Sequence, residues 1–87
     1  MCKNNNYLIT ISGERDDRER LAGRVVMYSA NLVTGLKNNT ATVAFYFRYK
    51  SDAKLVLRNV SKSLRVKLPT SESMNFGKAS ARIQKVA

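Results

Sequence analysis

The clearest pattern in the chain is an alternation of apolar and other side chains between Ala41 and Lys50. One set of alternate positions is Val43, Phe45, Phe47 and Tyr49, and the other is Thr42, Ala44, Tyr46, Arg48 and Lys50. A period of two is typical of a β-strand with one buried face. Two shorter apolar or β-branched runs, Tyr7–Ile11 and Leu64–Leu68, predict two further strands, the second of which stops at Pro69.

A helical pattern follows the first of these strands. From Glu14 seven charged residues follow one another, and opposite signs recur four residues apart, which supports a helix. The same period continues through an apolar stripe formed by Leu21, Val25, Val26, Tyr28, Leu32, Val33 and Leu36. We therefore predict one long helix over residues 13–37, although Gly23 and Gly35 each cost about 1 kcal/mol relative to alanine inside a helix.

Two later segments also carry helical spacing. Ser51 offers an N-cap for a helix over residues 52–62. Its apolar residues recur three or four positions apart and are Ala53, Val56, Leu57, Val60 and Leu64. Residues 1–6 and 70–77 are polar and are expected to be flexible. Ala79, Ile83 and Val86 then predict a short closing helix.

The order of predicted elements is β-α-β-α-β followed by a short C-terminal helix. Alternating strands and helices predict a small two-layer sandwich of the α/β or α+β class, with helices on one face of a small sheet. An alternative makes residues 24–34 a strand, which gives the β-α-β-β-α-β order typical of ferredoxin-like domains. Because 87 residues suffice for one core, we expect residues 1–87 to form a single domain.

Composition adds a strong net charge to this picture. The chain has 16 Lys and Arg against 6 Asp and Glu and no His, a net charge of +10 at neutral pH. The first 20 residues hold four basic and four acidic side chains, so residues 21–87 carry the whole excess. This excess is larger than solubility requires. It indicates an anionic partner, either DNA or RNA or an acidic protein surface.

The basic residues also follow a pattern along the chain. Lys54, Arg58 and Lys62 repeat every four residues on a predicted helix, where like charges destabilise by about 0.2–0.5 kcal/mol per pair unless an anion neutralises them. We predict one positive surface that contacts phosphates. Its primary residues are Lys54, Arg58, Lys62, Arg48 and Lys50, and its secondary residues are Arg65, Lys67, Lys78, Arg82 and Lys85. Tyr46 alternates among these cations, either to stack on a base or to pack beside a helix.

Several classes of function lack the residues that they need. Without histidine, His-based triads and His metal sites are excluded, and the lone Cys2 forms no intrachain disulfide or cysteine cluster. The acidic residues between Glu14 and Glu19 are interleaved with arginines, which does not favour a metal-dependent nuclease. No apolar run approaches the roughly 20 residues of a membrane helix. We therefore expect a cytoplasmic, non-enzymatic protein with no cofactor, metal or membrane partner.

Two classes of function fit these observations. The first is a nucleic-acid-binding protein that contacts phosphates with weak sequence preference. The alternative is a small inhibitor or adaptor, of the kind that phages direct against host or defence complexes, which docks on an acidic or nucleic-acid-binding surface of a larger protein. Its apolar anchor would be Tyr46, Tyr49 or Phe76. A helix that keeps an apolar stripe exposed after folding would favour this alternative or a homodimer.

Overall fold

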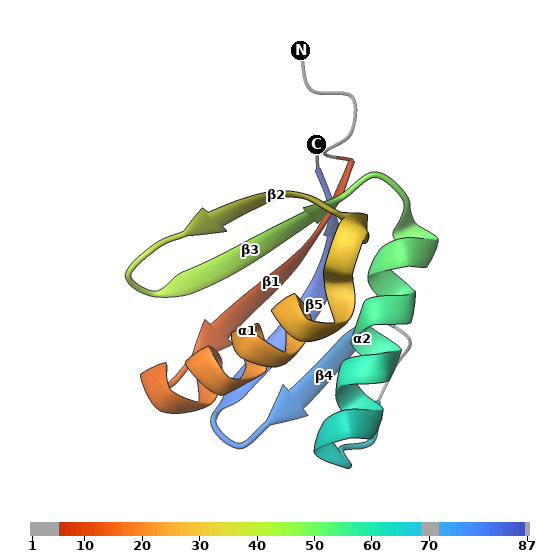
Figure 1. The fold of residues 1–87 in the computed structure, drawn as a ribbon. Coiled ribbons are helices and arrows are strands. Elements are labelled where there is room, and N and C mark those ends of the chain that lie inside the picture. Colours follow the sequence, from red (N-terminus) through yellow and green to blue (C-terminus); the bar gives the residue numbers. More distant parts are fainter. Residues whose placement is uncertain (1–5, 69–71, 87) are drawn as a thin grey trace.

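An open antiparallel sheet forms the framework of the domain. The computed structural model describes residues 6–68 and 72–86. In this part of the chain the elements are β1 (Tyr7–Gly13), α1 (Arg15–Ser29), a 3-10 turn (Ala30–Leu32), β2 (Val33–Asn38), β3 (Thr42–Phe47), α2 (Lys50–Leu64), β4 (Ser73–Phe76) and β5 (Ala79–Lys85). The strands lie in the order β2-β3-β1-β5-β4, and each neighbouring pair is antiparallel (Figure 1).

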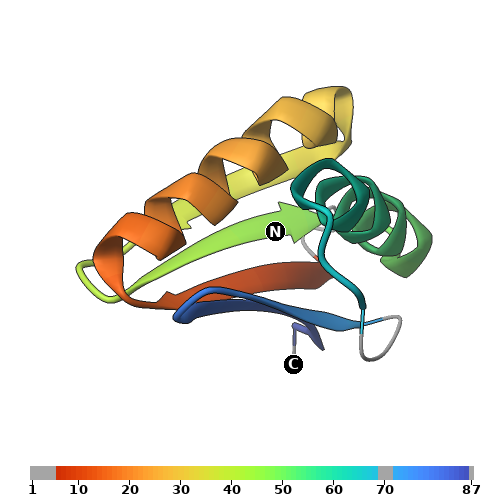
Figure 2. The same ribbon diagram turned by 90° about the horizontal axis from the view of Figure 1, so that it is seen from below.

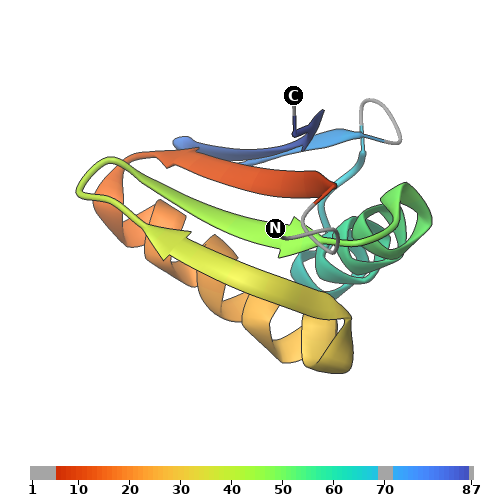
Figure 3. The ribbon, with the colours of Figure 1, turned by 90° about the horizontal axis from the view of Figure 1, so that it is seen from above.

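The molecule has two layers. Both helices lie on one face of the sheet, and the opposite face carries no helix of the described residues (Figure 2). Figure 3 shows the same arrangement from the other side of the molecule. Arg24 of α1 donates a hydrogen bond to the Ser63 hydroxyl of α2, which ties the two helices together. The protein is therefore a small α+β domain, and the predicted two-layer arrangement is confirmed.

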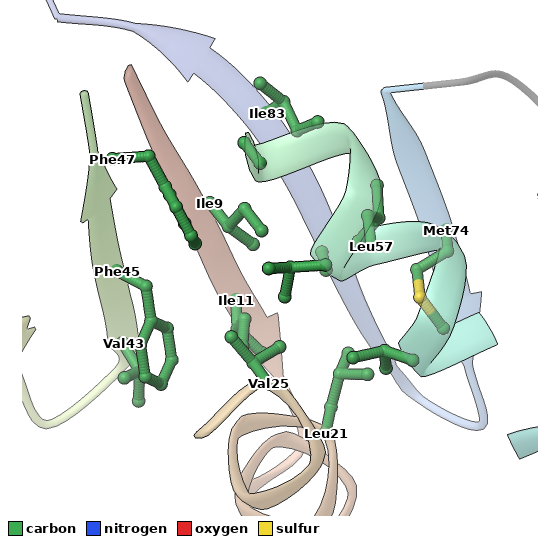
Figure 4. Packing of buried hydrophobic residues seen from close by; sticks show 14 of the residues in the cluster. Ile9, Ile11, Leu21, Val25, Val43, Phe45, Phe47, Leu57, Met74 and Ile83 are labelled. Carbon is green, nitrogen blue, oxygen red and sulfur yellow. The ribbon is translucent and has the colours of Figure 1, made fainter. Parts of the chain in front are cut away.

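The core fills the space between the sheet and the helices. The alternate positions that point into it are Ile9 and Ile11 of β1, Val43, Phe45 and Phe47 of β3, and Ala81 and Ile83 of β5. Leu21 and Val25 of α1, Leu57 of α2 and Met74 of β4 complete it (Figure 4). Each of these side chains is less than a tenth exposed. The alternation that predicted a half-buried strand between Ala41 and Lys50 is confirmed in β3, which ends at Phe47.

The first helix ends earlier than its apolar stripe predicts. α1 stops at Ser29, so the prediction of a helix over residues 13–37 is wrong. The alternative placed a strand at 24–34, but the strand is Val33–Asn38 and pairs with β3. Strand pairing gives the backbone of this segment its hydrogen-bond partners. It also removes Gly35 from a helix interior, where it would be unfavourable.

The second helix is longer than predicted at both ends. It begins at Lys50, so Ser51 lies inside the helix and Tyr49 takes the N-cap position without a side-chain hydrogen bond. It continues to Leu64, so the predicted strand over residues 64–68 is wrong. Arg65 follows in the left-handed conformation, with φ of 57°, which is a common way to end a helix.

The expected closing helix is a strand. Ala79 and Ile83 satisfy helical spacing, but with Ala81 they also alternate, and β5 uses this period of two to pair with β1 along its length. Residues 73–76 form β4, so the expectation of a flexible segment over 70–77 is wrong there. Residues 1–5 and 70–71 of the two expected flexible segments lie outside the described residues.

Replacing Gly23 by alanine is expected to stabilise the fold. Gly23 is exposed in α1, and a Cβ added there would meet nothing within 4 Å. The free energy of unfolding should therefore rise by about 0.5–1 kcal/mol, as measured by urea denaturation. The contrasting variant is Gly13→Ala, because Gly13 has φ of 120° and its Cβ would clash with the backbone of Lys78 and Ala79. It should lower the free energy of unfolding, and equal effects of the two substitutions would contradict the structure.

Candidate functional site

The basic side chains of α2 line the solvent side of the helix. Lys54, Arg58, Lys62 and Arg65 form what we term the α2 ridge. The opposite side of the helix is fully buried through Ala53, Val56, Leu57 and Val60, and this packing holds the ridge outward. Arg58, Lys62 and Arg65 are exposed and form no ion pair with a described residue, while Lys54 is half-buried. The ridge therefore offers unneutralised positive charge over about 15 Å of helix.

Lys50, at the start of the same helix, already has an acidic partner. Its Nζ lies 2.9 Å from Oε2 of Glu72, just before β4. This hydrogen bond is the largest cause that holds the pKa of the Glu72 carboxyl below its ordinary value of 4.5. Desolvation of the carboxyl opposes this effect, and the charges of Lys50 and Lys54 lower the pKa further. Lys50 is therefore less available to a phosphate than the α2 ridge.

Replacing Lys50 by methionine is expected to raise the pKa of Glu72 toward 4.5, and NMR titration of the carboxyl carbon measures it. Because the folded-state pKa is lowered, the pair stabilises the fold above about pH 4.5, and this contribution is lost as the pH falls through the folded-state pKa. Lys54→Met should shift the same pKa less, because Lys54 acts only through its charge. A larger shift in Lys54→Met than in Lys50→Met would contradict this assignment.

A second group of predicted residues lies on the uncovered side of the sheet, which we term the open face. Tyr46 alternates with the buried Phe45 and Phe47, and Arg82 alternates with buried residues of β5. Lys37 also lies on the open face. It pairs with Ala44 of β3, which alternates with the inward-pointing Val43 and Phe45. The sequence reasoning missed Lys37 because it placed this residue at the end of a helix. Its neighbours Asn38 and Asn39 carry the turn signal that could have indicated a hairpin.

The predicted single positive surface is therefore two separate surfaces in the structure. The α2 ridge belongs to the helical layer, whereas Tyr46 and Arg82 belong to the opposite side of the sheet. The expected closing helix would have placed Lys78, Arg82 and Lys85 on one side, but β5 is a strand, whose residues point alternately to its two faces. Lys78 lies in the turn before β5, and its Nζ is 3.7 Å from Glu14 Oε2.

The remaining predicted cations lie at the ends of elements. Arg48 follows β3, and its guanidinium lies 5.2 Å from the centroid of the Tyr49 ring, within the range of a cation–π contact. Lys85 ends β5 and pairs with Tyr7, which in turn pairs with Phe47, so Arg48 and Lys85 mark the same end of the sheet. Lys67 is exposed in the irregular segment after α2.

The acidic residues of the first 20 positions support the fold. Asp17 Oδ2 accepts the backbone N–H of Lys78 at 2.8 Å, and Glu19 pairs with Arg15 at 3.2 Å as the helical spacing predicted. Arg18 instead donates to the carbonyls of Gly13 and Thr40. Within the described ranges, no group of three His, Cys, Asp or Glu residues is placed to hold a metal ion. Asp17 and Glu14 join the start of α1 to the β4–β5 turn through Lys78.

Apolar side chains are exposed on α1 and β2. Val26, Met27 and Leu36, which we term the apolar patch, are 58%, 63% and 60% exposed. Val26 and Leu36 line a groove between α1 and β2, and Met27 lines a second groove on the other side of Gly23. Phe76, one of the predicted anchors, is half-buried at the edge of the second groove. Val26 and Leu36 belong to the apolar stripe that was expected to be buried, and both are exposed.

Comparison with protein-family models, with curated proteins and with solved structures finds no match to this chain. Among the described residues, neither helix is long and apolar enough to cross a membrane.

Proposed function

We propose that this protein is a non-enzymatic nucleic-acid-binding domain that contacts phosphates through the α2 ridge. The observation that supports the proposal is the exposure of Arg58 and Lys62 of α2, and of Arg65 at its C-cap, without an ion pair to a described residue. Each cation that neutralises a phosphate releases a condensed counterion, which drives binding without reading bases. The expected binding is therefore salt-dependent and weakly selective for sequence. DNA and RNA as partners agree with the expected cytoplasmic location.

The finer description of the fold belongs to the same proposal. Without β4, the observed elements follow the β-α-β-β-α-β order of the ferredoxin-like alternative. We interpret β4 as a strand added at the edge beside β5. In this arrangement the helices cover one face of the sheet and leave the other face free for a ligand.

Fluorescence anisotropy of labelled single- and double-stranded DNA and RNA tests the proposed function. The expected result is a dissociation constant in the micromolar range or tighter at about 0.15 M salt. We also expect a slope of log affinity against log salt that corresponds to several phosphates. Binding that disappears at this salt for all four polymers would contradict the proposal.

A second candidate is supported by a different observation. The apolar patch is an exposed surface of the kind that marks contacts between proteins. It favours the inhibitor or adaptor that docks on a larger protein, with Met27 rather than Tyr46 as the anchor. A pull-down after nuclease treatment tests this candidate. It is supported if the wild type recovers one partner in stoichiometric amount and the Met27→Glu variant does not. A monomeric protein that recovers no partner would contradict it.

A further inference from the structure

The open face is a regular array whose positions follow from the strand register. One row across the sheet runs through Lys37, Ala44, Thr10, Arg82 and Ser73. The neighbouring row runs through Gly35, Tyr46, Leu8 and Gln84. Neighbouring strands are about 4.8 Å apart, so the Cα atoms of Lys37 and Arg82 are about 14 Å apart. Two cations therefore lie on either side of a floor of small side chains.

No acidic side chain opposes these cations from the sheet itself. None of the five described strands contains Asp or Glu. Glu72, the acidic residue next to β4, pairs with Lys50 of α2 in the other layer. The guanidinium of Arg82 is exposed and forms no ion pair with a described residue. The open face is therefore positive, although its net charge is smaller than that of the α2 ridge.

The floor beside Arg82 is hollowed and carries hydrogen-bond donors. The hollow has a volume of about 240 Å³ and is lined by Thr10, Ser12, Thr42, Ser80, Arg82 and Gln84. The Thr10 hydroxyl donates to Oε1 of Gln84 at 2.9 Å, so the amide nitrogen of Gln84 keeps its hydrogens for a ligand. Hydroxyl, amide and guanidinium donors together suit the oxygens of a phosphodiester.

Tyr46 supplies the aromatic surface in the neighbouring row. It is half-buried and is the aromatic residue among the described positions of the open face. Its partner in β2 is Gly35, which has no side chain to cover the ring from that side. From the strand spacing and rise, the Cα atoms of Tyr46 and Arg82 are about 12 Å apart. A base on Tyr46 and a phosphate near Arg82 can thus belong to one short stretch of chain.

We propose that the open face binds a single-stranded segment of nucleic acid, with a base stacked on Tyr46 and a phosphate in the hollow beside Arg82. The proposal rests on the proposed function and adds both a site and a preference for single strands. In a duplex, each base is paired and covered by its neighbours, so its face does not reach a tyrosine on a flat sheet. A duplex therefore offers this surface only phosphates, whereas a single strand offers phosphates and bases.

The test compares an oligothymidine with a DNA duplex of equal length at about 0.15 M salt. Tyr46→Leu is expected to weaken oligothymidine binding about tenfold, because leucine offers no aromatic ring on which a base can stack. Arg82→Gln should weaken it about fivefold. Both variants should bind the duplex within about twofold of the wild type, because the duplex is expected to bind the α2 ridge. The matched controls are Tyr28→Leu and Arg20→Gln, both on α1, which should leave single-strand binding unchanged.

A spectroscopic variant gives a second readout that does not depend on affinity. The chain has no tryptophan, so Tyr46→Trp introduces one reporter on the open face. Saturating oligothymidine should quench its fluorescence, and a saturating duplex should not. Unquenched fluorescence would overturn the stacking site, and Tyr28→Trp is the matched control.

The outcomes separate this inference from the proposed function. If Tyr46→Leu and Arg82→Gln bind oligothymidine like the wild type, while an α2 ridge variant binds it more weakly, the open-face site is wrong and the proposed function stands. Equal losses for single strand and duplex would overturn the preference for single strands. If the wild type binds neither polymer at this salt, the proposed function fails and the open-face site fails with it.

Discussion

Replacing Lys54, Arg58 and Lys62 together by alanine is expected to weaken binding to duplex DNA by about 100-fold at about 0.15 M salt. Each phosphate contact contributes about 0.9 to the slope of log affinity against log salt, which corresponds to about fivefold in affinity at this concentration. The triple variant should therefore lower the slope by about three, and Arg58→Ala alone by about one. Alanine favours a helix, so α2 should remain folded, which circular dichroism can verify.

A matched variant separates the α2 ridge from the general field of a protein with a charge of +10. Arg15, Arg20 and Lys78 lie outside the α2 ridge and the open face, and replacing them by alanine removes the same charge. This control should lose much less than the ridge variant, because it removes no close phosphate contact. Equal losses in the two variants would show that the position of the charge does not matter, and unchanged binding in the ridge variant would contradict its assignment.

Phe47→Ala is expected to remove most of the stability of the domain. Phe47 is fully buried at the end of β3, and truncation of such a side chain costs about 3–5 kcal/mol through lost contacts and the cavity left behind. Small domains have a free energy of unfolding of only about 5–15 kcal/mol. Urea denaturation should therefore show a much lower midpoint with a similar cooperative transition.

The nearby Tyr49 provides the control for this substitution. Its side chain is 53% exposed, so Tyr49→Ala should cost about 1 kcal/mol or less. A loss below about 1 kcal/mol in Phe47→Ala would contradict its position in the core. A loss in Tyr49→Ala as large as that in Phe47→Ala would show that the loop before α2 is more tightly packed than its exposure indicates.

The sequence predicted those elements whose pattern had one interpretation. The alternation around Phe45 is found in β3, and the spacing from Ala53 to Val60 is found in α2. Both patterns are local consequences of strand and helix geometry. The errors occur where two periods coexist in the same residues. Ile83 fits a helical spacing and a strand alternation equally, and only pairing with β1 selects the strand.

The candidate site was predicted as a set of residues but not as a surface. Arg58 and Lys62 lie one helical turn apart, as predicted, because both belong to α2. Lys37 was missed and Lys78 was misplaced, because their faces depend on hairpins that the periodicity does not reveal. Val26 was expected in the core, and it is exposed because the buried side of α1 is narrower than the predicted apolar stripe.

The sequence by itself determined β3, α2, the two-layer class and the concentration of positive charge after residue 20. These properties depend on composition and on the spacing of residues along the chain. The local geometry of strands and helices then determines which of these residues share a face. Tertiary structure decided that Val33–Asn38 and Ala79–Lys85 are strands, because their hydrogen-bond partners lie in other elements. It also decided that Tyr46 and Arg82 share the open face while Arg58 lies in the other layer, because strand register and helix packing assign each side chain to a side of the sheet.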